Sequence, residues 1–275
     1  MNRHTGHHNH SAVQQMSDTK GKAHAVEHGE HVGVEIQQTM TYNVNLQTDP
    51  AKPRANVATQ LAIVVTGQPA GEVIDEFDLV HEKPMHLIIV RDDLSYFDHL
   101  HLEPQHGVFN TSYSFPNAGD YKLWVDVKPK GGRQFLTAFQ THVEGQPLHE
   151  RIPLMADNQF TRIVMDGQYR VSLVLPSEPS NHHGSNLTFN ITDTNGKPIT
   201  DLQPMLGAKA HCIIISQDLR DFLHVHPTEE VHASWRGGPD ATFHAQFPKA
   251  GLYKIWVQFQ HHGKTITADF VVQIK

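Results

Sequence analysis

An internal repeat limits the architecture of this chain more than any other feature of its sequence. Residues 84–101 align without gaps with residues 209–226, at an offset of 125 positions. Residues 115–125 then align with residues 247–257, at an offset of 132 positions. Two such matches in the same order exclude chance. Because each unit is long enough to hold a core of its own, the repeat predicts two duplicated domains and not a solenoid.

The residues that follow position 33 show the patterns of β-strands. Residues 42–47 and 121–127 alternate between apolar and polar side chains, and residues 86–90 are typical of a buried strand. No stretch has a convincing helical period. The expected fold class is therefore all-β, with two tandem antiparallel β-sandwiches over residues 34–146 and 147–275.

Each repeat also carries an Ala-Gly-x-Tyr step. Gly119 and Gly251 are expected to take the positive φ of a turn, and Tyr121 and Tyr253 then open a strand. This arrangement is similar to the tyrosine corner of immunoglobulin-like domains. We assign these residues to the fold, together with Trp124 and Trp256.

The N-terminal tail, residues 1–33, is rich in histidine and has hardly any bulky apolar side chains. Such a segment cannot bury enough surface to order itself, so we expect it to be disordered. Short histidine-rich tracts bind metal ions loosely because of their composition. Loose metal capture and a purely solubilising role are both open for the tail.

Charge and hydropathy narrow the range of partners. The chain has 275 residues, 23 of them histidine, and a formal net charge of −7 with histidine neutral. A net negative charge offers no basic surface for binding nucleic acid, and it favours cations as partners. No apolar run approaches the roughly 20 residues of a membrane span, and the first residues lack the apolar segment of a signal peptide. Two locations stay open: inside the cell, or outside it after removal of a leader.

Four polar positions recur in the aligned segments. They are His86, Asp93, His99 and His101 in the first repeat, and His211, Asp218, His224 and His226 in the second. A hairpin whose turn is centred between residues 93 and 94 places His86 opposite His101, and Ile88 opposite His99. Opposed residues share a sheet face with Cβ atoms ~5 Å apart, and positions two residues apart on a strand are ~6.5–7 Å apart. Three imidazoles would therefore converge, unless an odd-length loop turned His86 to the other face.

Two interpretations of these histidines are open. Imidazole nitrogens bind Cu(II), Zn(II) or Ni(II) at ~2.0–2.1 Å, and copper heads the affinity order for such sites. The six repeated histidines would then form one metal site per repeat, holding copper or, as the second choice, zinc. Alternatively, the histidines are buried and hydrogen-bonded among themselves or to Asp93 and Asp218. The single cysteine, Cys212, aligns with Leu87 and is expected in the core, which argues against a blue-copper electron-transfer site.

Motifs of catalysis are missing from the sequence. It has no nucleophile elbow, phosphate-binding loop, H-E-x-x-H helix or dinucleotide fingerprint. A three-histidine metal with an open position could activate water, but the sequence places no general base beside it. We therefore expect no catalytic residues and no enzyme, but a protein that captures, buffers or delivers metal. The alternative is a cell-surface or interaction β-sandwich module whose histidines are structural.

Residues 85–101 and 115–124, with their second copies, resemble bacterial cell-envelope domains that are called YtkA-like or copper-resistance-associated. The resemblance covers most of residues 40–143 and 168–275. It implies immunoglobulin- or cupredoxin-like sandwiches, an extracytoplasmic setting, a role near heavy-metal handling, and another metal-handling envelope protein as a partner. The first repeat has Leu102 after its last histidine where the second has Pro227, so the two sites are expected to differ.

Overall fold

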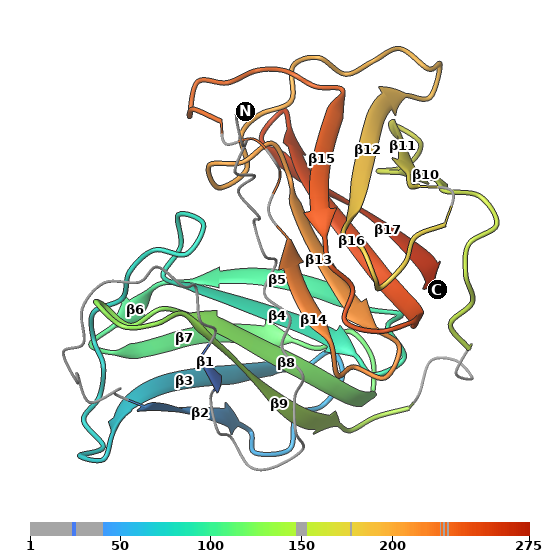
Figure 1. Ribbon diagram of the computed structural model, residues 1–275. Coiled ribbons are helices and arrows are strands. Elements are labelled where there is room, and N and C mark those ends of the chain that lie inside the picture. Colours follow the sequence, from blue (N-terminus) through green and yellow to red (C-terminus); the bar gives the residue numbers. More distant parts are fainter. Residues whose placement is uncertain are drawn as a thin grey trace. The chain divides into compact units, whose positions relative to one another are not determined.

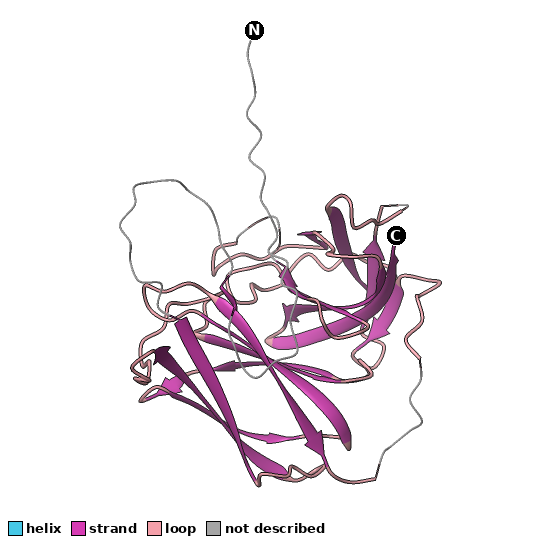
Figure 2. Cartoon of the chain, turned by 60° about the horizontal axis from the view of Figure 1, so that its bottom comes forward, coloured by secondary structure: helices cyan, strands magenta, loops and turns pink. Residues whose placement is uncertain are grey.

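The computed structural model describes residues 24–25, 41–146, 153–176, 178–225, 227, 229 and 231–275. Every regular element within these ranges is a β-strand, as the secondary-structure colouring of Figure 2 shows, and no helix there could cross a membrane. The predicted all-β class is confirmed. Of the predicted tail, only His24–Ala25 is described, and these two residues pair with strand β9. The chain divides into two compact units between Pro153 and Leu154.

The first unit contains two sheets (Figure 1). One has the order β2-β3-β7-β6, formed by Thr41–Asp49, Ala58–Gln68, Val108–Ser114 and Pro104–Gln105. The other has the order β1-β9-β8-β4-β5, formed by His24–Ala25, Phe135–Val143, Gly119–Val127, Met85–Arg91 and Phe97–Leu102.

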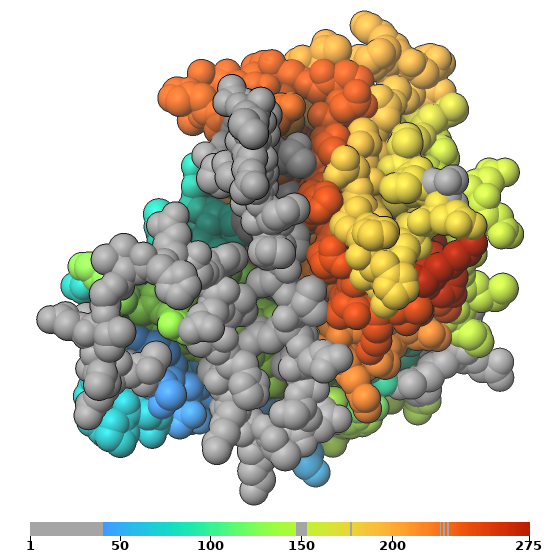
Figure 3. All heavy atoms as spheres, viewed as in Figure 1, coloured from blue at the N-terminus to red at the C-terminus, as the bar shows by residue number. Residues whose placement is uncertain are grey.

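The second unit repeats this plan with two further sheets. One has the order β10-β11-β12-β15, formed by Thr161–Val164, Tyr169–Val174, Ser185–Asp193 and Asp240–Ala245. The other has the order β14-β13-β16-β17, formed by Phe222–Val225, His211–Ser216, Gly251–His261 and Lys264–Ile274. The pairing of β12 with β15 brings together residues that are 50 to 60 positions apart in the sequence, and the yellow and orange surfaces of the two segments adjoin in Figure 3.

One sheet of each unit has the same strand order. Strands β5-β4-β8-β9 of the first correspond in order to β14-β13-β16-β17 of the second, and all pairs of named strands are antiparallel. The duplication predicted from the aligned segments is therefore seen in the strand order as well.

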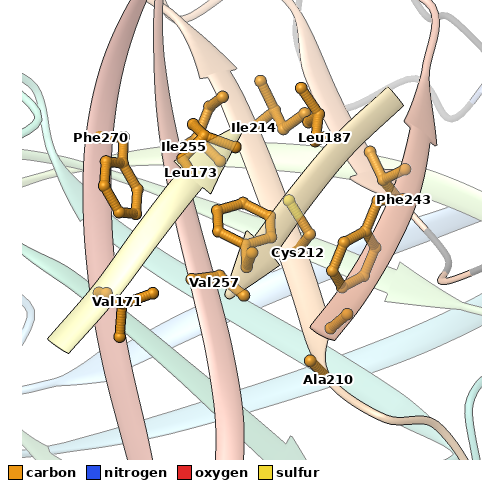
Figure 4. Packing of buried hydrophobic residues seen from close by; sticks show 14 of the residues in the cluster. Val171, Leu173, Leu187, Ala210, Cys212, Ile214, Phe243, Ile255, Val257 and Phe270 are labelled. Carbon is orange, nitrogen blue, oxygen red and sulfur yellow. The ribbon is translucent and has the colours of Figure 1, made fainter. Parts of the chain in front are cut away.

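Alternating apolar residues form the core of each sandwich. In the first unit, Leu61 and Ile63 of β3 face Leu87 and Ile89 of β4 in one buried cluster. Figure 4 shows the corresponding core of the second unit, where Cys212 lies among residues of both sheets. Full burial of each large aliphatic or aromatic side chain contributes about 1.5–3 kcal/mol. The prediction that Cys212 is a core residue is confirmed, and its burial raises the pKa of the thiol.

Both repeats contain the expected tyrosine corner. The Tyr121 hydroxyl donates to the Asn117 carbonyl oxygen at 2.9 Å, and the Tyr253 hydroxyl donates to the Lys249 carbonyl oxygen at 3.0 Å. Gly119 and Gly251, which precede these tyrosines, have φ angles of 130° and 143°. The predicted positive φ at the two glycines is confirmed, and both Trp124 and Trp256 are buried.

Candidate metal centre

The hairpin of β4 and β5 has the predicted register. His86 is the cross-strand partner of His101, and Ile88 is the partner of His99. Leu87 and Ile89 point into the core, so His86, His99 and His101 all lie on the opposite face of the sheet. The odd-length loop that would have separated His86 from His101 does not occur.

The three imidazoles of this first cluster are close together. Their ring centroids are 5.1 Å apart for His86 and His99, 4.9 Å for His86 and His101, and 4.4 Å for His99 and His101. The structure therefore brings together all three histidines that the sequence predicts for the first repeat.

The hydrogen bonds of His86 define its tautomer. Its Nε2 lies 2.7 Å from the Val80 carbonyl oxygen, which can only accept, so Nε2 carries the proton. Its Nδ1, 2.9 Å from His99 Nε2, must then be the acceptor when His86 is neutral. A metal-binding histidine usually donates its other ring N–H in this way, often to a backbone carbonyl. The Nδ1 atom of His86 is thus the one that could bind a metal.

His101 presents a nitrogen of a different kind. Its Nε2 atom is buried and has no hydrogen-bond partner among the described residues. Burial, together with the nearby His86 and Lys83, lowers the pKa of His101 to about 4. The ring is therefore neutral at pH 7, as a metal ligand must be.

Two side chains that the sequence analysis did not single out lie beside this cluster. The ring of His81 is 5.6 Å from that of His86, and Asp126 on β8 is the cross-strand partner of His86. The Asp126 carboxylate accepts a 2.7 Å hydrogen bond from Gln134 Nε2. The alternation of β8 could have revealed Asp126, because this residue faces away from the core. His81 stands in an irregular turn with a φ of 49°, which no strand pattern predicts.

The second repeat has a related but different set. His211 and His224 lie on adjacent strands with ring centroids 5.7 Å apart, and Ile213 is the partner of His224. His226 lies outside the described residues. At the offsets of the repeat, Leu206 replaces His81 and Gln258 replaces Asp126. The expected inequality between the repeats thus extends to the neighbours of the histidines.

Asp93 and Asp218 stabilise the hairpin turns. Asp93 accepts hydrogen bonds from the backbone and side chain of Ser95 and forms a 3.2 Å ion pair with Arg91. Asp218 accepts from the Ser216 hydroxyl at 2.6 Å and from Lys249 at 2.7 Å. In both turns the next residue, Leu94 or Leu219, has a positive φ. The recurrence of these aspartates is explained by the turn that sets the hairpin register.

Comparison with known proteins supports the duplication. The family model with the description "Domain of unknown function (DUF8832)" matches this chain twice, over residues 37–145 and 163–275. No curated protein matches the chain.

Solved structures show only distant similarity. An Escherichia coli alpha-2-macroglobulin is 11% identical with a TM-score of 0.26, over 86% of this chain and 15% of that one. A Parabacteroides merdae beta-glucuronidase is 13% identical with a TM-score of 0.22, over 86% of this chain and 25% of that one. A structure titled for carbohydrate-binding modules of the β-sandwich superfamily is 14% identical with a TM-score of 0.23, over 87% of this chain and all of that one.

Proposed function

The chain belongs to the family described as "Domain of unknown function (DUF8832)", which names no activity, and we propose from its histidine geometry that it is a non-catalytic metal-binding protein. Each repeat would hold one ion through its three histidines, and the chain would capture, buffer or deliver the metal. Copper is the first choice and zinc the second, because copper heads the affinity order for imidazole sites. The resemblance to copper-resistance-associated domains extends the proposal to the cell envelope, with another metal-handling protein as partner.

The observation that carries the proposal is the set of nitrogens in the first repeat. His86 Nδ1 and His99 Nε2 are 2.9 Å apart, and the ring centroid of His101 lies 4.4 Å from that of His99 and 4.9 Å from that of His86. In a tetrahedral site with bonds of ~2.0–2.1 Å, ligand atoms stand ~3.3 Å apart. An ion could therefore replace the hydrogen bond between His86 and His99 with a shift of a few tenths of an ångström, while His86 keeps its bond to Val80.

One observation favours the alternative, an interaction module with structural histidines. Both ring nitrogens of His86 already have hydrogen-bond partners within the protein. A histidine satisfied in this way is a stable part of a core without any metal. The two functions differ in whether the cluster binds an ion at all.

Equilibrium dialysis against copper and zinc at neutral pH distinguishes them, using residues 34–275 to remove the histidines of the tail. We expect retention of copper at about one ion per repeat, with weaker zinc retention. The structural alternative holds if this part of the chain retains no ion that is lost when His99 and His224 are both changed to glutamine.

A further inference from the structure

A second group of metal-binding side chains occurs in the second repeat, away from the proposed histidine clusters. Asp201, His261 and His262 each offer one ligand atom, and these atoms all lie within 4.8 Å of one another. On β16 the core residues are Ile255, Val257 and Phe259, so His261 at the end of that strand continues the core face. His211 and His224 lie on the other face of the same sheet.

We propose that Asp201, His261 and His262 form a site for a divalent transition-metal ion such as Zn²⁺. His261 Nε2 is 3.0 Å from the Asp201 carboxylate Oδ1, and the His261 and His262 rings are 3.8 Å apart. Two imidazoles and one carboxylate suit zinc, with ligand bonds of ~2.0–2.2 Å and a fourth position open to water. Replacing the His261–Asp201 hydrogen bond by an ion requires these two atoms to separate by only a few tenths of an ångström.

The surroundings of His261 hold its ring in place for this role. Its Nδ1 is 2.8 Å from the Tyr169 hydroxyl of β11, and the ring is buried. With a metal on Nε2, Nδ1 carries the proton and donates a hydrogen bond to the Tyr169 oxygen, which orients the ring.

His262 lies in the tight turn that joins β16 and β17. It occupies the first position of the two-residue turn between β16 and β17, with a φ of 50°, followed by Gly263 at 72°. Such turns favour asparagine, aspartate or glycine, and histidine also adopts a positive φ more often than most residues. Since both His262 and Asp201 are exposed, an ion from solvent can reach the site.

The first repeat provides no equivalent of this site. At the offset of 132 positions, Pro129 and Lys130 replace His261 and His262. The loop with Asp201 is tied to the end of β16 by a hydrogen bond of 2.8 Å from the Gln203 amide to the Gln260 carbonyl. The proposed site is therefore specific to the second repeat and does not depend on the proposed function of the histidine clusters.

The test is the number of Zn²⁺ ions that the full chain retains against a competing chelator at neutral pH. His262→Asn suits the turn, so it should keep the fold, and Asp201→Asn changes an exposed side chain. We expect each variant to lose one ion, whereas His232→Asn, which alters another exposed histidine of the same repeat, loses none. Tyr169→Phe should keep the number of bound ions unchanged and raise the dissociation constant of this ion about 10–100-fold.

An unchanged count in either His262→Asn or Asp201→Asn overturns the three-ligand site. Loss of an ion in His232→Asn as well overturns it too, because the binding would then be unspecific. All four variants leave the six repeated histidines intact, so the outcome is independent of whether those bind metal.

Discussion

At the scale of residues, His99 and His101 occupy one cluster with different bonding. His99 Nε2 donates to His86, whereas His101 Nε2 is buried and has no hydrogen-bond partner within the part of the chain that the structure describes. A buried polar atom in this state costs free energy unless a ligand uses it. Substitution of each residue in turn therefore distinguishes the contribution of a histidine to stability from its contribution to metal binding.

We predict that His99→Ala lowers the unfolding free energy of the metal-free protein by about 1–3 kcal/mol, because it leaves a cavity and unpairs His86 Nδ1. His101→Ala should cost less, since it removes no hydrogen bond from Nε2. Both variants should lose the ion of the first repeat. Urea denaturation and copper dialysis measure the two effects, with the exposed His142→Gln as control. Retention of that ion by His101→Ala would contradict the three-histidine site.

A second residue-scale prediction uses the two equivalent glycines as matched sites. A Cβ on Gly119 would lie 3.0 Å from Arg91 Nε, whereas a Cβ on Gly251 would have no atom within 4 Å. Alanine at either position must adopt the positive φ, which lowers the unfolding free energy by about 1–3 kcal/mol. We expect Gly119→Ala to lower the unfolding free energy more than Gly251→Ala. Equal losses would mean that the Arg91 side chain moves away freely.

At the scale of elements, the hairpin turn decides what the sequence could reveal. The register followed from the polar run that ends in Asp93, because the hydrogen bonds of this aspartate fix a turn with Leu94 at positive φ. His81 could not be predicted, since its position depends on an irregular turn between Val80 and Lys83. Asp201 and His261 are sixty residues apart, and no periodic pattern joins them.

The turn of the second repeat leads to a prediction about pH. Burial alone would raise the pKa of Asp218, but hydrogen bonds from Lys249, Ser216 and the Arg220 amide lower it to about 2. The unfolded value is about 3.9. The carboxylate therefore stabilises the fold fully above about pH 4, and this contribution is lost as the pH falls towards 2. Thermal midpoints between pH 5 and 2 should fall less steeply for Asp218→Asn; an identical slope would contradict this role.

At the scale of the whole molecule, the fold was predictable because the repeat, the strand alternation and the Ala-Gly-x-Tyr step all indicate the same sandwich. The strand order and the added edge strands β6 and β10 could not be predicted, because they depend on pairing between distant segments. One family model matches both halves of the chain, so the duplication extends over residues 37–145 and 163–275.

Removal of residues 1–33 tests the expected independence of the folded units from the tail. It takes away His24–Ala25, which contribute only a two-residue pairing with β9. We expect the thermal midpoint to stay within about 2 °C of the full chain, while the number of weakly bound metal ions falls. A large drop in the midpoint, measured by calorimetry, would show that the tail stabilises the fold.

The most direct test of metal binding by the repeated histidines is the number of tightly held Cu²⁺ ions in the double variant His99→Gln, His224→Gln. Residues 34–275 with these two changes, compared with the same residues unchanged, should lose two copper ions at neutral pH, one per repeat. Spectroscopy of the unchanged protein should show nitrogen ligands around the copper. Equal copper binding by the two proteins, or no tight copper in either, would contradict the account.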